Sequence, residues 1–125
     1  MTFCMCSSKT EPMACTAQVT TDRVDVWTGS PAPEGVLETA ARIAGVPVEK
    51  TFVHNCWVGG SFGGGARPRQ AVNHAVMVAK TLSGRPVKLV WAREQDLAHD
   101  NYRQMLVARC EGTIDPGGVP KAALY

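Results

Sequence analysis

Five glycines in seven positions give residues 59–65 the most distinctive chemistry of the chain. The stretch follows Cys56, Trp57 and Val58, and it encloses a single aromatic residue, Phe62. Glycine lets the backbone approach a ligand closely because it has no Cβ, and the unpaired N–H groups at the start of a helix attract oxyanions. The loop therefore predicts a binding site for an anion such as phosphate or a metal-oxo group.

Two well-known nucleotide-binding loops do not fit this stretch. A Walker loop ends in Gly-Lys followed by Ser or Thr, whereas this one continues as Gly65-Ala66-Arg67 and lacks the lysine that meets the β- and γ-phosphates. The dinucleotide fingerprint G-x-G-x-x-G is also absent, since the glycines have the reversed spacing. A solvated surface loop would leave the Phe62 side chain exposed to water, whereas large apolar side chains normally pack on a core or a ligand. Nucleotides are therefore not the first choice of ligand.

The cysteines and histidines form no pattern of their own. The five cysteines are scattered, and Cys4 and Cys6 lack the two-residue spacer of a C-x-x-C pair. The three histidines show neither H-x-x-x-H nor H-E-x-x-H spacing. We expect free thiols and no metal held by protein side chains, and we assign no catalytic residue to this chain.

Composition predicts one small soluble domain. The chain has 125 residues, of which 45% are hydrophobic and 19% charged, and its formal net charge is +2. The basic residues are dispersed, so nucleic acid is not an expected partner. We expect no membrane span, because no apolar run approaches ~20 residues. The sequence around Met1 lacks the layout of a signal peptide, and no compartment can be assigned.

Several local patterns predict the elements before the loop. Alternating apolar residues predict strands at 14–20 and 23–28, joined as a hairpin. Helical spacing predicts a helix at 33–44, with proline at its first position and Gly45 just after its end. A β-rich run at 51–58 leads directly into the glycine loop.

A second helix is predicted after the loop, ending near Gly84. It is followed by a short buried strand at 87–91, so we expect a βαβ unit whose parallel strands belong to one sheet. A helical turn is expected at 93–96. The apolar face of the second helix comprises Val72, Ala75, Val76, Ala79 and Leu82.

The remaining residues predict a strand at 105–111, a turn at 115–118 and a last strand at 119–125. The expected fold class is α+β, as a two-layer α/β arrangement. It has a mixed sheet, two main helices and the βαβ unit that carries the glycine-rich loop.

The loop sequence Gly59-Gly60-Ser61-Phe62-Gly63 resembles the G-G-G-F-G loop in the molybdenum-binding subunits of the xanthine oxidase and aldehyde oxidoreductase family. Four further blocks resemble, in order, the isoquinoline 1-oxidoreductase beta-subunit branch. These blocks are residues 11–17, 26–30, 84–91 and 93–96. The resemblance runs from Glu11 onward. It implies a partial molybdenum-cofactor-binding domain at 11–125, preceded by an unmatched segment at 1–10.

This resemblance implies a fragment of a molybdenum hydroxylase large subunit, an oxidoreductase that hydroxylates N-heteroaromatic or aldehyde substrates. The cofactor implied is molybdopterin with molybdenum, in the cytosine dinucleotide form. Electrons would leave through iron–sulfur clusters in a separate small subunit. Gly60, Ser61, Phe62 and Gly63 match the cofactor-binding loop, whereas the family's base glutamate lies in a later part of the subunit. The fragment would therefore need the remainder of the large subunit for activity.

The chain departs from the family pattern at several positions. Pro31 stands where a glutamine commonly follows the block at 26–30, and proline offers neither an amide side chain nor a backbone N–H. Gly64 and Gly65 replace two arginines of the isoquinoline branch. Ala66 replaces a substrate-binding glutamate of xanthine-oxidising relatives.

Two alternative functions stay open on the residues alone. The loop could belong to an independent module that binds a small anion or a nucleotide, or the chain could be a structural fragment without a ligand.

Overall fold

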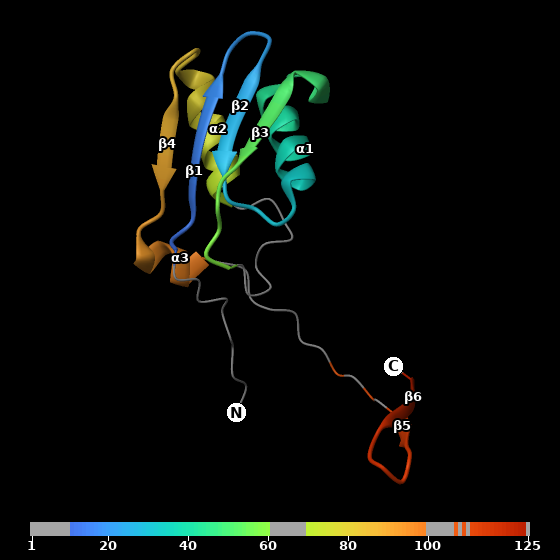
Figure 1. Cartoon of the computed structure of the whole chain (residues 1–125). Helices are drawn as coiled ribbons and strands as arrows, with labels where there is room; N and C mark the ends of the chain where they lie inside the picture. The colour runs from blue at the N-terminus through green and yellow to red at the C-terminus, as the bar shows by residue number, and fades with distance from the viewer. Residues whose placement is uncertain (1–10, 61–69, 100–106, 108, 110, 125) are drawn as a thin grey trace.

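A four-stranded sheet packs one of its faces against two helices (Figure 1). The computed structural model describes residues 11–60, 70–99, 107, 109 and 111–124. The strands of the sheet are β1 (Ala14–Val19), β2 (Val24–Thr28), β3 (Thr51–Asn55) and β4 (Val87–Val90), and the helices are α1 (Pro33–Ala44) and α2 (Gln70–Thr81). The α+β fold class, with its mixed sheet and two main helices, is confirmed.

Smaller elements complete the chain. The 3-10 turn η1 (Val48–Lys50) precedes β3, and the short helix α3 (Arg93–His99) follows β4. The strands β5 (Glu111–Ile114) and β6 (Pro120–Leu124) form a separate antiparallel hairpin. None of the described helices has the length and apolar character that a membrane crossing requires.

Local sequence signals placed the first hairpin and the first helix correctly. β1 and β2 pair antiparallel, with Thr16 opposite Trp27, and the Thr20 N–H donates to the Arg23 carbonyl across the turn at 2.8 Å. The end of α1 depends on Gly45, whose φ of 77° lies in the left-handed region that favours glycine. Its N–H donates to the Ala41 carbonyl at 2.9 Å and closes the helix.

The strand order differs from a simple βαβ unit around the glycine loop. The order is β3-β2-β1-β4, so β3 and β4 lie at opposite edges of the sheet. β1 is antiparallel to both β2 and β4, and β2 is parallel to β3, so β4 runs in the same direction as β3 but is separated from it by two strands. The reason is that the β1–β2 hairpin occupies the centre of the sheet. The helix that joins neighbouring parallel strands is therefore α1, not α2.

The core lies between the sheet and the helices. Alternate residues of β1 and β2 face the helices and are almost fully buried, including Ala17 and Val26, both without exposed area. α2 faces β1 with small residues, which lets the two backbones approach closely. The predicted apolar face of α2 is buried except at Leu82, which follows the helix and is 47% exposed.

Two strand predictions need correction, and a third lies mostly outside the described residues. β3 ends at Asn55 rather than at residue 58, because its partner β2 ends opposite Asn55, at Thr28. β4 is not a buried strand, since it forms an edge of the sheet and Val90 is 54% exposed. The strand expected at 105–111 lies mostly outside the described residues, which include only 107, 109 and 111 of that range, and the described strand β5 begins at Glu111.

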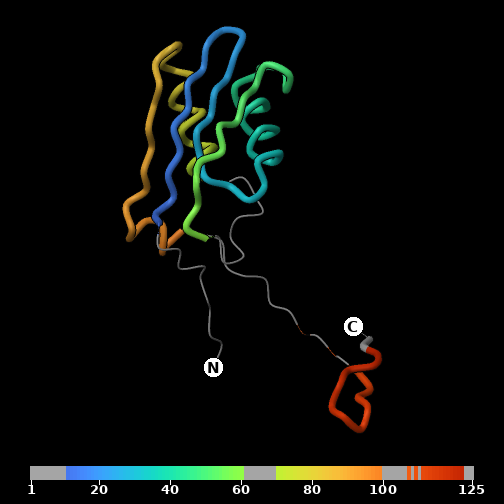
Figure 2. The backbone as a smooth tube through the Cα atoms, in the orientation of Figure 1, coloured from blue at the N-terminus to red at the C-terminus, as the bar shows by residue number. Residues whose placement is uncertain are grey.

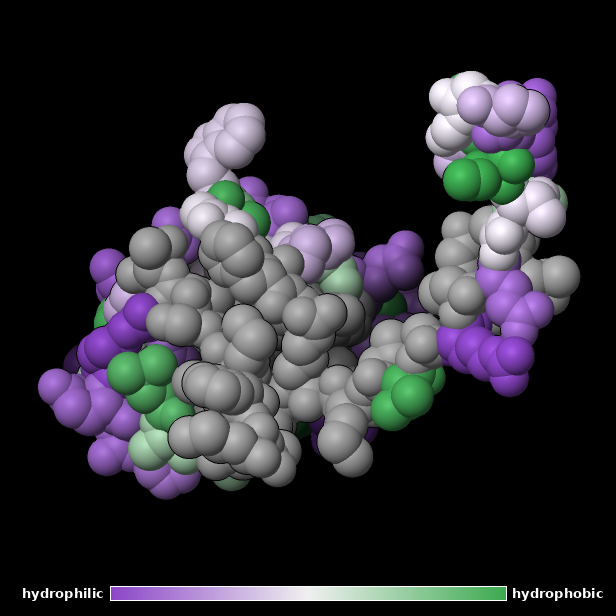
Figure 3. Space-filling model, turned by 90° about the horizontal axis from the view of Figure 1, so that it is seen from below, coloured by the Kyte–Doolittle hydropathy of each residue, from purple (hydrophilic) through white to green (hydrophobic). Residues whose placement is uncertain are grey.

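The predicted turn at 115–118 and the last strand are confirmed. Asp115 Oδ1 accepts hydrogen bonds from the N–H groups of Gly117 at 2.9 Å and Val119 at 3.0 Å. Those bonds lower the pKa of the Asp115 carboxyl, the Val119 contact most strongly. Figure 3 shows a hydrophobic patch on this hairpin, where Ile114 is 72% and Val119 is 54% exposed.

The face of the sheet opposite the helices carries a charged and aromatic cluster. Arg23 donates to both carboxylate oxygens of Asp25, at 2.6 and 2.8 Å, and lies 4.2 Å from the centre of the Phe52 ring. His54 Nε2 lies 2.9 Å from Asp25 Oδ1, and the Trp27 ring stacks on His54 at 4.7 Å. The Arg23 hydrogen bond, helped by His54, lowers the pKa of Asp25 from 3.8 to about 2.

We expect Asp25→Asn to change how stability depends on pH. Because the folded-state pKa of Asp25 lies below its unfolded value, its contribution is present above pH ~4 and is lost as the pH falls through about 2. The free energy of unfolding of the wild type should exceed that of the variant by about 1–2 kcal/mol at pH 7, and this difference should vanish near the folded-state pKa. Urea unfolding of both chains between pH 7 and pH 2 measures this difference. A constant difference over that range would contradict the assignment.

Candidate functional site

The carboxyl ends of β2 and β3 lie side by side at one end of the sheet (Figure 2). Because these strands are parallel, the chain leaves both of them at the same edge. The Cys56 N–H donates to the Thr28 carbonyl at 3.0 Å, and the Ser30 N–H donates to Asn55 Oδ1 at 2.9 Å. Two sequence-distant segments are thereby fixed together, the block at 26–30 and the entry to the glycine loop at 56–60.

Gly29 marks the closest approach of these two segments. A Cβ built on Gly29 would lie 3.0 Å from Val58 Cγ2 and 3.2 Å from the Trp57 carbonyl oxygen. The first atom belongs to a side chain, but the second is backbone and cannot move alone. The lack of a side chain at Gly29 is therefore what lets the entry to the loop pass so closely.

A third segment reaches the same place. A Cβ on Gly59 would lie 2.9 Å from Glu11 Oε1, so the Glu11 carboxylate covers the backbone where the loop begins. Glu11 stands in the first block of the family resemblance, and Gly29 in the second. The structure thus brings three of the sequence blocks, which are far apart in the chain, to one end of the sheet.

Of the four predicted cofactor-binding residues, the structure describes one. Gly60 has a φ of 108°, a backbone conformation that residues with side chains rarely adopt. Ser61, Phe62 and Gly63 lie outside the described residues, as do the departures at 64–66. Their role in binding a cofactor stays a prediction.

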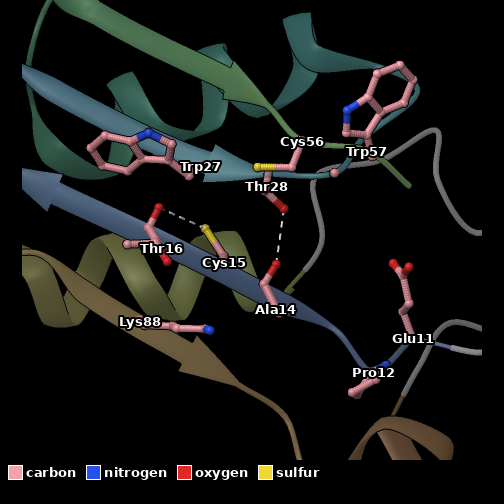
Figure 4. Close-up of a pocket in the computed structure, with 11 residues that line it drawn as sticks. Glu11, Pro12, Ala14, Cys15, Thr16, Trp27, Thr28, Cys56, Trp57 and Lys88 are labelled. Carbon is pink, nitrogen blue, oxygen red and sulfur yellow. Dashed lines mark hydrogen bonds between the residues drawn. The ribbon is translucent and has the colours of Figure 1, made fainter. Parts of the chain in front are cut away.

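A cavity of about 290 Å³ opens beside this meeting point (Figure 4). Lys88 of β4 and Glu11 contribute opposite charges from different walls, and Trp27 contributes an aromatic ring. Trp57 stands at the rim with its side chain fully exposed, at 101%. The cavity is lined by Glu11, Pro12, Ala14, Cys15, Thr16, Trp27, Thr28, Gly29, Cys56, Trp57 and Lys88.

Sequence reasoning missed the part that Lys88 and Glu11 play here. Each is an ordinary charged residue in its own segment, and only the order of the strands brings them to one cavity. The alternation along β4 was the one available signal, because it places Lys88 on the face opposite the core residues Val87 and Leu89.

The thiols at the cavity do not form a reactive pair. Burial raises the pKa of the Cys15 thiol to about 12, and the nearby Cys56 adds to the increase. Cys15 is therefore a neutral thiol at physiological pH rather than a nucleophile. Both cysteines are free, and the described residues contain no cluster of three or more His, Cys, Asp or Glu side chains that could hold a metal ion.

The other aromatic and acidic residues have structural partners. Trp91 stacks on His74 with ring centres 5.6 Å apart and meets His99 edge-on at 6.3 Å. Asp96 is buried and accepts a hydrogen bond from Arg93 at 3.3 Å, which places it in the packing of α3. Trp57 differs, because the described residues give its indole no core to pack against.

The backbone at this end of the sheet suits a cofactor that is bound mainly by main-chain N–H groups. Gly29 lets the two segments pack closely at the loop entry, where a Cβ would meet neighbouring atoms, and Gly60 has a conformation suited to glycine. A bulky anionic cofactor approached by backbone N–H groups needs such a shape. The described residues therefore fit the edge of a molybdopterin site.

Comparisons with known proteins point to the same cofactor. A family model described as the molybdopterin cofactor-binding domain matches residues 6–123. Isoquinoline 1-oxidoreductase subunit beta of Brevundimonas diminuta is 33% identical over 105 residues, which are 83% of this chain and 13% of that protein. Aldehyde oxidase 3 of Mus musculus is 28% identical over 100 residues, covering 80% of this chain and 8% of that protein.

A third relative is similar over a shorter region. The membrane-bound aldehyde dehydrogenase [pyrroloquinoline-quinone] of Gluconacetobacter polyoxogenes is 31% identical over 80 residues, or 64% of this chain and 10% of that protein. The chain thus spans only about a tenth of the length of these curated relatives.

Proposed function

The chain belongs to the molybdopterin cofactor-binding domain family, within the xanthine oxidase group, and from this we propose that it is part of a molybdenum hydroxylase large subunit. The proposal rests mainly on one observation: the block at 26–30 lies against the entry to the glycine loop. Two hydrogen bonds join these segments, and Gly29 packs closely against Trp57 and Val58. This is the place where the family resemblance puts the cofactor.

In this proposal the chain positions the cofactor but supplies no catalytic group. When bound, molybdopterin supplies the molybdenum chemistry that hydroxylates an electron-poor carbon. The β2 and β3 ends position the loop entry, and Gly60, Ser61, Phe62 and Gly63 would present backbone N–H groups and one aromatic ring to the cofactor. Fixed N–H donors near a changing oxygen charge stabilise it without reorganisation.

The finer assignments follow the resemblance. We propose the cytosine dinucleotide form of molybdopterin, an N-heteroaromatic or aldehyde substrate, and an iron–sulfur small subunit as electron acceptor. The remainder of the large subunit would supply the base and most pterin contacts. The name of the Brevundimonas diminuta relative, a subunit beta, supports an assembly with other subunits.

We further propose residues 11–125 as the packed part of the partial domain, although the family model already begins to match at residue 6. Met13 is the first core side chain of the described residues and is only 2% exposed, and β1 begins at Ala14. The packed part of the chain therefore starts just after Glu11.

Calorimetric titration of the chain assembled with the remainder of its proposed large subunit tests the proposed ligand class. We expect heat of binding with molybdopterin and with its cytosine dinucleotide, and none with GTP, ATP or inorganic phosphate. Binding of ordinary nucleotides without binding of the pterins would instead favour the independent anion- or nucleotide-binding module.

A further inference from the structure

The side chain of Asn55 joins the end of β3 to the turn that follows β2. Its Oδ1 accepts a hydrogen bond from the Ser30 N–H at 2.9 Å, although the two residues are 25 positions apart in the sequence. Ser30 is only 5% exposed, so water has little access to this residue. A buried N–H that loses its acceptor is destabilising. Asn55 therefore supplies an acceptor that the turn needs.

Side-chain oxygens, rather than strand pairing, accept the hydrogen bonds of the turn at 29–32. The Ser30 N–H donates to Asn55, and the Ala32 N–H donates to Ser30 Oγ at 3.1 Å. Pro31 lies between these two donors and has no N–H of its own. The helix α1 begins directly after this turn. The path of the chain from β2 to α1 thus depends on the contact with Asn55.

This contact lies beside the loop entry. The Cys56 N–H donates to the Thr28 carbonyl at 3.0 Å, and Asn55 bonds the turn two residues further along. Gly29 lies between these two hydrogen bonds and packs against the loop entry. We propose that Asn55 is a positioning residue for the cofactor, because its side chain holds this turn against the loop entry. The inference rests on the proposed function.

Two substitutions separate the acceptor from the size of the side chain. Asn55→Leu keeps a similar volume but removes the acceptor, whereas Asn55→Asp keeps a carboxylate oxygen for the Ser30 N–H. Hydrogen exchange of the Ser30 amide is measured in the chain assembled with the remainder of its proposed large subunit, without cofactor. It should be about tenfold faster in Asn55→Leu than in the wild type, and Asn55→Asp should keep the wild-type rate.

Calorimetric titration of the same assemblies measures the effect on the cofactor. Asn55→Leu should raise the Kd for molybdopterin about five- to tenfold, as expected for the loss of one hydrogen bond. A wild type that binds no pterin would overturn the proposed function and this inference together. If the wild type binds pterin, an Asn55→Leu variant with an unchanged Kd or an unchanged Ser30 exchange rate would overturn only the role of Asn55.

Gln18→Leu is the matched control. Gln18 Nε2 donates to the Gly84 carbonyl at 2.9 Å, so this variant also loses one hydrogen bond between a side-chain amide and the main chain. Gln18 lies near the end of β1, whereas the start of β1 lies beside the end of β2. Both variants should lower the thermal unfolding midpoint by similar amounts, but Gln18→Leu should keep the wild-type Kd and Ser30 exchange rate. An equal rise in Kd in both variants would show that Asn55 acts only through stability and would overturn the proposal.

Discussion

Gly29→Val is expected to weaken the binding of molybdopterin at least tenfold. The new side chain would start from a Cβ only 3.2 Å from the Trp57 carbonyl oxygen and 3.0 Å from Val58 Cγ2, so the loop entry must move away from the end of β2. A displacement of about 1 Å at a positioning element can reduce function by about two orders of magnitude. The pterin titration measures the change in Kd, and Gly29→Ala should give a smaller effect in the same direction.

Gly45→Ala separates this local effect from a general loss of stability. Gly45 ends α1 with a φ of 77°, and the nearest atom to an added Cβ is Lys80 Nζ at 3.8 Å, so the cost is backbone strain of about 1 kcal/mol. α1 runs back from the end of β2 to the start of β3, and its last residue lies away from the loop entry (Figure 1). Gly45→Ala should therefore lower stability without changing the pterin Kd. Equal losses of binding in both variants would show that Gly29 acts only through stability.

Val26→Asp is expected to unfold the chain. Val26 has no exposed area and lies in β2, one of the two central strands, where it faces the helices. An unpaired carboxylate at this position costs several kcal/mol, which is comparable to the whole stability of a small domain. Circular dichroism and urea unfolding measure the loss directly.

Val90→Asp is the matched substitution at the edge of the same sheet. Val90 is 54% exposed, so the carboxylate keeps most of its hydration and the cost should stay below about 1 kcal/mol. A similar loss at both positions would contradict the two-layer arrangement, in which only one face of the sheet is covered.

The contrast between α1 and the sheet shows what local sequence can specify. Pro33 and Gly45 define the two ends of α1 through their own backbone preferences, and the predicted range agrees with the structure at both ends. The position of β4 depends instead on which strand edge the β1–β2 hairpin leaves free. The apolar run at 87–91 could not reveal this, because a buried strand and an edge strand with one covered face have similar composition.

The candidate site was also predictable only where local sequence specifies it. The glycine loop and the block at 26–30 were recognised from their residues, and Gly29 proved to be their point of contact. The convergence of Glu11 and Lys88 on one cavity was not predictable, since it follows from the sheet order and not from either segment. The full exposure of Trp57 could not be predicted from the sequence either, because a tryptophan after a β-rich run usually packs on a core.

The most direct measurement of the central claim is the molybdenum and pterin content of the chain purified together with the remainder of its proposed large subunit. We predict about one molybdenum and one pterin per complex, and loss of both in the Gly29→Val variant. A folded wild-type complex that retains neither molybdenum nor pterin would contradict the claim that this chain forms part of a molybdopterin site.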